Sequence, residues 1–175
     1  MTTPVMADGR GHALQEMVSA LQRLSSLLAE ADPSWCVYGS LALALNGVPG
    51  IEVHDVDVLM SAEGVQRLMR NLPQVQLLHD DKPGGRFRSL HARVYMGGVE
   101  IDLSGDLQLC QDGVWTPVSV ESACLWQGIR FASLSSCILL LRQFARPKDL
   151  ARLELVDEAC RQGLCGQQAS PPAEP

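Results

Sequence analysis

Two aspartates alternate with apolar residues in the segment 53–60, which reads VHDVDVLM. We predict a strand over 53–60 on which Asp55 and Asp57 share one face, because residues two apart in a strand point the same way. Val56 and Val58 would then enter the core. Two carboxylates this close repel each other unless one takes up a proton or a divalent cation neutralises both. The pair therefore predicts a cation site.

A second acidic strand follows a Gly-Gly turn at residues 97–98. We predict a hairpin of 87–95 with 99–103, in which Glu100 and Asp102 lie on one face. Asp55, Asp57 and Asp102 together can hold one or two Mg²⁺ ions, because magnesium binds a few carboxylates and completes its shell with water and phosphate oxygens. We rank Glu100 second, since it could be only a solvated neighbour of Asp102.

A Gly-Ser pair, Gly39 and Ser40, opens a short apolar helix over 40–45. A tight turn with a capping serine would explain the pair, and so would phosphate binding at a helix N-terminus. With the Asp55-Val56-Asp57 triplet and the later Asp102, the pair resembles the DNA polymerase beta-like nucleotidyltransferase superfamily in its minimal, single-domain form.

This resemblance implies a metal-dependent transferase that moves a nucleoside monophosphate from an NTP such as ATP to an acceptor hydroxyl, releasing pyrophosphate. It implies that Gly39 and Ser40 contact the triphosphate. It also implies that Asp55, Asp57 and Asp102 are the catalytic residues and hold the metal. The expected metal is a pair of Mg²⁺ ions.

The segment 135–150 is similar to the helix, basic turn and Lys-Asp pair of relatives that include toxins of type IV toxin-antitoxin systems and antibiotic-modifying enzymes. Arg142, Arg146 and Lys148 are therefore candidates for nucleotide binding, by complementing triphosphate charge. Cations near the end of a helix also stabilise its dipole without any ligand, and the sequence leaves both readings open.

The chain departs from the family pattern at Ile51, Val53 and Arg152. These departures favour an alternative from another class, a non-catalytic nucleotide-binding or protein-interaction module that keeps the fold.

Four basic side chains around the strand 87–95 are also ambiguous, since they could face the acceptor or water, and we favour water. They are Arg86, Arg88, His91 and Arg93.

The elements that must position these residues alternate between helix and strand, which predicts an α/β (α+β) fold with a mixed β-sheet and flanking helices. The helices are expected over 14–29, 40–45, 62–71, 135–144 (capped by Ser135) and 148–161. Besides 53–60 and the hairpin, the strands are expected over 35–38, 75–79, 115–118 and 129–132. A polar loop over 80–85 is expected beside the site.

Length and composition set outer limits. A chain of 175 residues with 46% hydrophobic residues suits one domain, which we predict over 11–162 with disordered tails over 1–10 and 163–175. The net charge of −6 and the pI near 5.1 argue against a general nucleic-acid binder. Six scattered cysteines without a Cys-x-x-Cys pair predict buried free thiols rather than disulfides or a zinc site.

The acceptor stays open between a small molecule, a tRNA and a protein hydroxyl, because acceptor choice lies in loops. No apolar run reaches the ~20 residues needed to span a bilayer, so we expect a cytoplasmic protein without a membrane partner. The sequence also leaves open a homodimer or an antitoxin-like partner. A single small domain leaves little room for a deep acceptor pocket unless a second subunit completes it.

Overall fold

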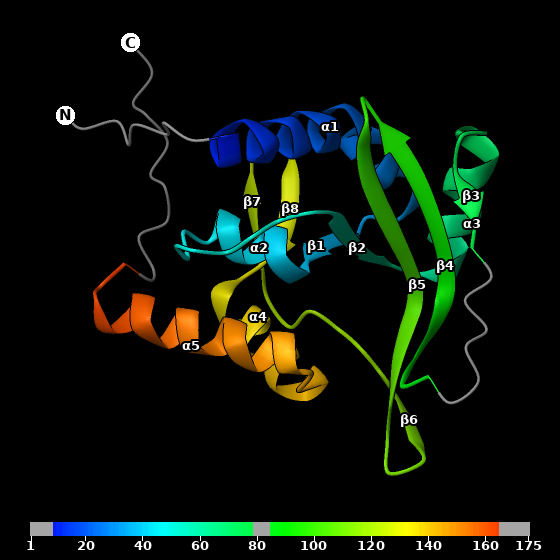
Figure 1. Cartoon of the computed structure of the whole chain (residues 1–175). Helices are drawn as coiled ribbons and strands as arrows, with labels where there is room; N and C mark the ends of the chain where they lie inside the picture. The colour runs from blue at the N-terminus through cyan, green and yellow to red at the C-terminus, as the bar shows by residue number, and fades with distance from the viewer. Residues whose placement is uncertain (1–8, 79–84, 165–175) are drawn as a thin grey trace.

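The computed structural model describes residues 9–78 and 85–164, and Figure 1 shows how their helices and strands are arranged. The helices are α1 (Gly9–Ala31), α2 (Gly39–Leu45), α3 (Ala62–Asn71), α4 (Leu134–Phe144) and α5 (Pro147–Arg161). The strands are β1 (Cys36–Tyr38), β2 (Val56–Met60), β3 (Gln76–Leu77), β4 (Phe87–Met96), β5 (Val99–Gln111), β6 (Val114–Pro117), β7 (Ala123–Trp126) and β8 (Ile129–Ala132).

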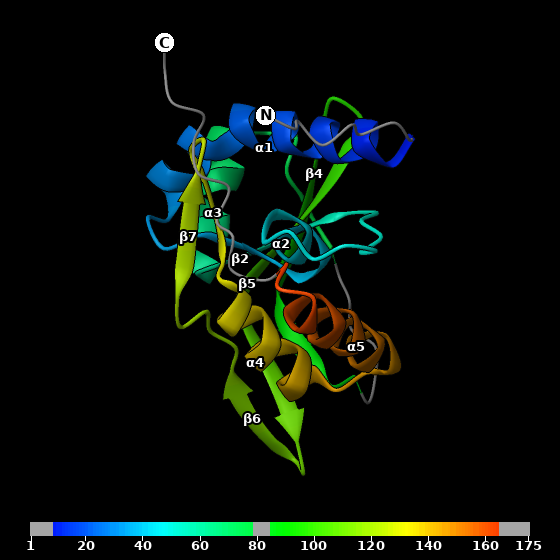
Figure 2. The same cartoon turned by 90° about the vertical axis from the view of Figure 1, so that its left-hand side faces the viewer.

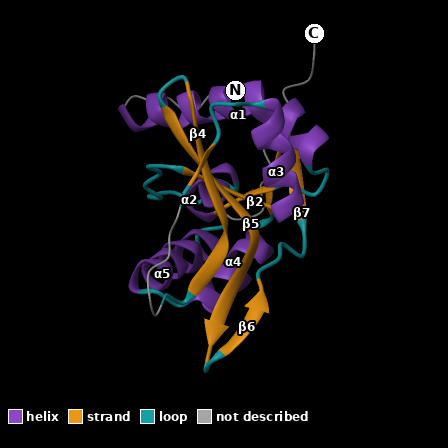
Figure 3. Cartoon of the chain, turned by 90° about the vertical axis from the view of Figure 1, so that its right-hand side faces the viewer, coloured by secondary structure: helices purple, strands orange, loops and turns teal. Residues whose placement is uncertain are grey.

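The strands of this part of the chain form one mixed sheet in the order β3-β4-β5-β2-β1-β8-β7, with β6 paired to the far end of β5. β1 runs antiparallel to β2 and parallel to β8, whereas β2 runs parallel to β5. The β4–β5 hairpin is the long twisted ribbon of Figure 3, and β6 extends its lower end. The predicted mixed sheet with flanking helices is thereby confirmed.

The helices cover the sheet from opposite sides. α1 runs along the top of Figure 1, while α4 and α5 lie at the bottom and pack side by side, as Figure 2 also shows. α1 reaches the core through Leu21, Leu24 and Leu28, which are fully buried at the three- and four-residue spacing of one helix face. None of the described helices has the length and apolar character that a bilayer crossing requires.

A buried carboxylate joins the end of α1 to the start of α3. Asp32 accepts hydrogen bonds from the backbone N–H and hydroxyl of Ser34 and from the backbone N–H of Ser61, at 2.8, 2.6 and 2.6 Å. Burial by itself raises the pKa of Asp32, but these hydrogen bonds outweigh it and hold the pKa below its ordinary value. Ser61 in turn caps α3 by accepting from the Gly64 N–H at 3.0 Å.

The predicted strand 53–60 is wrong at its start, because β2 begins only at Val56. β2 has ladder partners from Val56 to Met60, whereas Glu52 and His54 are exposed and lie before the ladder. Asp55 therefore lies at a bend just before the strand instead of within it. Val56 and Val58 are fully buried, as predicted.

Other boundaries also differ from the prediction. β5 continues to Gln111, because it pairs with β4 on one edge and with β2 and then β6 on the other. α4 begins one residue early and is capped by Ser133, whose hydroxyl accepts from the Ser136 N–H, instead of by Ser135. The sequence prediction missed β7, and β3 is shorter than predicted.

The tails and the polar loop fall largely outside the described part of the chain. α1 begins at Gly9, two residues before the predicted start of the domain, and residues 1–8 and 165–175 are not described. Of the predicted loop 80–85, only Gly85 is described. Five of the six cysteines are described, and all five are free thiols, of which Cys36 and Cys137 are buried.

Candidate functional site

The three predicted aspartates converge at the centre of the sheet. The parallel register of β2 with β5 sets Asp57 opposite Asp102, and the bend before β2 brings in Asp55. One carboxylate oxygen from each of the three lies within 4.8 Å of the others. The prediction that Asp55 and Asp57 lie together is therefore confirmed, although Asp55 reaches the site from a bend instead of from the strand.

Asp57 is the most strongly perturbed of the three carboxyl groups. Burial, followed by the charges of Asp55 and Asp102, raises the pKa of Asp57 to about 6 against the opposing effect of Lys148 and Arg152. The three side chains are only partly buried and open toward one cavity. Their oxygens are hard ligands of the kind that Mg²⁺ binds, and a cation would relieve their mutual repulsion, so the donor set fits this ion.

The turn between β1 and α2 packs directly against Asp57. Gly39 adopts φ +72°, a left-handed conformation that favours glycine. A Cβ at Gly39 would lie 2.6 Å from Oδ2 of Asp57, closer than real atoms approach. Glycine is therefore needed here both for the backbone angle and for the room that the carboxylate occupies.

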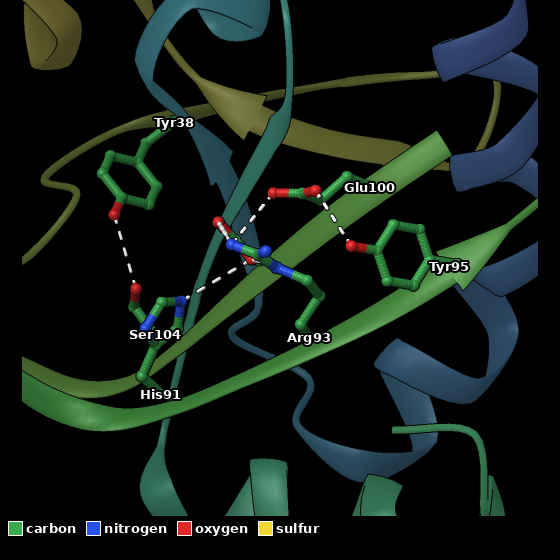
Figure 4. Close-up of polar contacts among 7 residues, drawn as sticks. Tyr38, His91, Arg93, Tyr95, Glu100 and Ser104 are labelled. Carbon is green, nitrogen blue, oxygen red and sulfur yellow. Dashed lines mark hydrogen bonds and ion pairs between the residues drawn. The ribbon is translucent and has the colours of Figure 1, made fainter. Parts of the chain in front are cut away.

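Asp102 is held from its other side by a polar network on β4 and β5, which Figure 4 shows. Arg93 donates from Nε and Nη2 to both oxygens of Asp102 at 2.6 and 3.1 Å, and its Nη2 lies 2.9 Å from Oε1 of Glu100. The hydrogen bonds to Asp102, followed by the nearby acidic charges, hold the pKa of Arg93 above its ordinary value. Nε2 of His91 lies 3.6 Å from Oδ1 of Asp102.

A cavity of about 460 Å³ opens beside the three aspartates. Its acidic wall faces a basic wall formed by Arg146, Lys148 and Arg152, at the start of α5. Apolar side chains complete the lining, among them Leu90, Phe87, Leu140 and Phe144. The cavity therefore combines anionic, cationic and apolar surfaces, which matches the metal, phosphate and organic parts of a nucleotide.

Arg146 is fixed in this wall by a fully buried carboxylate. Asp149 accepts from Nε and Nη2 of Arg146 at 2.6 and 3.1 Å and from the Arg146 backbone N–H at 3.1 Å, which closes the first turn of α5. The guanidinium also lies over the rings of Phe87 and Phe144, at 5.1 and 5.2 Å from their centroids. Its position is thus set before any ligand binds.

Comparison with solved structures finds a crystal structure from Thermotoga maritima, of a protein provisionally named a nucleotidyltransferase, with a TM-score of 0.61 and 24% sequence identity. The match covers 82% of this chain and 94% of that one. This chain therefore shares the fold of that protein, a mixed sheet flanked by helices. The resemblance inferred from the sequence is confirmed at the level of the fold.

Two structures from Helicobacter pylori match less well. They are JHP933 and a provisionally named nucleotidyltransferase, with 15% and 16% identity and TM-scores of 0.39 and 0.38. Each match covers 77% of this chain, which spans 56% and 58% of the length of those two chains. No protein-family model matches the chain, and no curated protein matches it either.

This fold brings most of the predicted site residues to one cavity. Those that line it are Gly39, Asp55, Asp57, Asp102, Arg146 and Lys148. Ser40 is buried in α2 and Arg142 is exposed on α4, and neither is among the residues that line the cavity. Nucleotide binding by Ser40 and Arg142 therefore stays a prediction.

Sequence reasoning underrated Arg93, His91 and Arg152. For Arg93 the expectation of a solvated strand residue is wrong, because it is ion-paired with Asp102 and Glu100. The signal was available: a two-residue turn at 97–98 pairs 96 with 99, and the same register pairs 93 with 102. Arg152 follows Lys148 by four residues, which sets both side chains on one face of a helix.

Proposed function

We propose that this protein is a metal-dependent nucleotidyltransferase that moves a nucleoside monophosphate from an NTP to an acceptor hydroxyl. One observation carries the proposal: in a nucleotidyltransferase fold, three converging carboxylates line the same cavity as Arg146, Lys148 and Arg152. A partly buried acidic cluster alone would repel an NTP. Opposite a basic wall, the same cluster suits a triphosphate that brings a divalent cation with it.

Asp55, Asp57 and Asp102 are the residues that would hold the metal, with two Mg²⁺ ions as the expected complement. When bound, Mg²⁺ neutralises phosphate charge and stabilises the charge that develops in phosphoryl transfer. Asp57 contributes most to the case, because burial and then the negative charges of Asp55 and Asp102 raise its pKa in the middle of the cluster. A cation there would favour the ionised form of this carboxyl group.

The remaining residues of the site bind and orient the triphosphate. Lys148 and Arg152 supply positive charge from α5, while Arg146 presents a guanidinium already oriented by Asp149. Gly39 lines the cavity next to Asp57, so the turn at Gly39 and Ser40 is the natural contact for the β and γ phosphates. These contacts would leave the α-phosphorus facing the acceptor.

In the reaction, the acceptor oxygen bonds to the α-phosphorus while the bond from the α-phosphorus to the bridging oxygen breaks. Pyrophosphate leaves with the electron pair of that bond, and the hydroxyl proton passes to water. We assign Asp102 as a metal ligand and not as the base, because Arg93 already donates to both of its oxygens. The acidic net charge of −6 disfavours an RNA acceptor over a small molecule or a protein.

The test is incubation of the purified protein with each α-labelled NTP, Mg²⁺ and a lysate of the source cells, followed by separation into small-molecule, RNA and protein fractions. We expect label in one fraction, and a loss of at least 100-fold in Asp57→Asn. Asp112→Asn is the matched control, since it makes the same chemical change at an exposed turn. Equal labelling by a folded Asp57→Asn variant would contradict the proposal.

Thermal unfolding and pyrophosphate release, measured on the same samples, distinguish the transferase from a non-catalytic nucleotide-binding module. Such a module would be stabilised by Mg²⁺ and NTP but would release no pyrophosphate and label no fraction. Pyrophosphate release that depends on Asp57 supports the transferase.

A further inference from the structure

Arg93 contacts Asp102, a carboxylate that we expect to bind a metal, through two hydrogen bonds. Both oxygens of Asp102 accept from the Arg93 guanidinium, and Glu100 lies against the same group. Figure 4 shows the Arg93 guanidinium beside Glu100. Arg93 is 27% exposed and is not among the residues that line the cavity, so it approaches Asp102 from behind the site.

This geometry leaves Asp102 able to bind a cation, but only weakly. A carboxylate oxygen has about two lone pairs, so each oxygen of Asp102 keeps one beside the bond from Arg93, and one of these oxygens lies within 4.8 Å of oxygens of Asp55 and Asp57. The guanidinium nevertheless cancels much of the negative charge of Asp102 and keeps a fixed positive charge next to it. Asp55 and Asp57 have no such guanidinium among their described hydrogen bonds and ion pairs, and Lys148 and Arg152 act on Asp57 only through space.

We propose that Arg93 takes the place of one divalent ion at Asp102, so that the protein without nucleotide binds a single divalent ion, at Asp55 and Asp57. The second ion binds only together with the triphosphate, because the phosphate oxygens supply the negative charge that Arg93 cancels on Asp102. This inference rests on the proposed metal site and adds a residue that controls its occupancy. Arg93 is a positioning residue, because it acts on the metal through Asp102.

A purely structural reading of the same contact is a cross-strand ion pair that stabilises the β4–β5 hairpin. The two readings differ in what they predict for metal binding. If the pair only stabilises the hairpin, its removal lowers stability and leaves the number of bound ions unchanged. If Arg93 replaces an ion, its removal adds one.

The experiment counts Mn²⁺ bound per chain by electron paramagnetic resonance, with and without a non-hydrolysable NTP. The variants are Arg93→Gln, which removes the charge, and Arg93→Lys, which keeps it without the two-pronged contact. Arg86→Gln is the matched control, since it removes one exposed positive charge near the start of β4. Circular dichroism and thermal unfolding check that each variant folds.

We expect one Mn²⁺ per chain for the wild type without nucleotide and two with it. Arg93→Gln should bind two without nucleotide, with the second site at least tenfold tighter than in the wild type. Arg93→Lys and Arg86→Gln should bind the same number of Mn²⁺ ions per chain as the wild type, both without and with nucleotide. A wild type that binds two ions without nucleotide, or an Arg93→Gln variant with wild-type counts, overturns the inference.

Failure of the proposed function gives a different result. If neither the wild type nor Arg93→Gln binds Mn²⁺, the metal site itself is wrong and both proposals are overturned. If both bind two ions and Asp57→Asn loses them, the metal site stands and only the role of Arg93 is overturned. Should Arg93→Gln fail to fold, Arg93→Met takes its place as the variant that removes the charge, with the same expected counts and the same outcome that overturns the inference.

Discussion

The carboxyl group of Asp57 lies at a point where its neighbours favour the neutral form. Partial burial and the charges of Asp55 and Asp102 raise the pKa of Asp57 to about 6 from an ordinary value of 3.8. In the absence of metal, ionising this group at neutral pH therefore costs free energy in the folded state that it does not cost in the unfolded chain. A residue that destabilises the fold in this way is typical of a functional site.

This pKa predicts how the stability of the metal-free protein depends on pH. Between about pH 4 and 6 the folded protein binds the Asp57 proton and the unfolded chain has released it, so stability falls as pH rises through this interval. Asp57→Asn should then be more stable than the wild type at pH 8, by up to about 3 kcal/mol. The difference should vanish near pH 4. Urea unfolding in the presence of a chelator, from pH 4 to 8, measures it.

Asp112→Asn is again the control for this series, because its exposed side chain should give no stability gain that grows with pH. Mg²⁺ should reduce the difference between Asp57→Asn and the wild type at pH 8, since it stabilises the ionised wild-type site alone. A stability difference that stays constant from pH 4 to 8 would contradict the assignment of the raised pKa to Asp57.

At the scale of elements, the junction of β1 with α2 shows how a turn and a strand define one site together. Gly39 takes a left-handed conformation at the start of α2, and Asp57 on β2 occupies the space where a side chain of residue 39 would lie. β1 and β2 pair through Tyr38 and Asp57, so the turn follows directly from the ladder position of the carboxylate.

We predict that Gly39→Ala impairs the site beyond its effect on the backbone. An alanine in a left-handed conformation costs about 1–2 kcal/mol, and here its Cβ must also displace the Asp57 carboxylate. Gly47→Ala is the matched control, because Gly47 has φ +79° and open space around its Cβ position. Unfolding should show a similar backbone cost for both, whereas Mn²⁺ affinity should fall at least tenfold only in Gly39→Ala. Equal Mn²⁺ affinity in the two variants would exclude the steric argument.

At the scale of the whole molecule, the cavity joins segments far apart in the chain. Its acidic wall comes from residues 55–57 and 102, and its basic wall comes from residues 146–152. The sheet order places β2 between β1 and β5, while the contact of α4 with α2 and β8 carries α5 to the same region. A ligand that binds between these walls should therefore stabilise the whole domain, because it holds the sheet and α5 together.

We predict that Mg²⁺ with an NTP at 100 times its Kd stabilises the protein by about 2.7 kcal/mol, and that either alone does less. Lys148→Gln should weaken NTP binding several-fold, since Lys148 is exposed and lines the cavity, and it should lower ligand-free stability at neutral pH only through the lost attraction to ionised Asp57. Thermal unfolding across an NTP titration measures both effects. Arg142→Gln is the comparison, because Arg142 is exposed outside the cavity lining. If Arg142→Gln weakened NTP binding as much as Lys148→Gln does, the assignment of the nucleotide to the basic wall would be wrong.

Local pattern alone was sufficient for much of this protein. Alternation of Val56 and Val58 with Asp57 determined which side chains enter the core, because a strand turns successive residues to opposite faces. The Gly97-Gly98 turn determined the hairpin and, through its register, the pairing of Arg93 with Asp102. The apolar spacing of Leu21, Leu24 and Leu28 determined the buried face of α1.

Only the tertiary structure decided which of these residues meet. The parallel pairing of β2 with β5, across 45 positions of sequence, sets Asp57 beside Asp102, and no local pattern encodes a parallel ladder. The packing of α5 decided that Lys148 and Arg152 face the acidic cluster while Arg142 does not. Charge, burial and the raised pKa of Asp57 follow from these long-range contacts, because they depend on distances between side chains and not on their order in the chain.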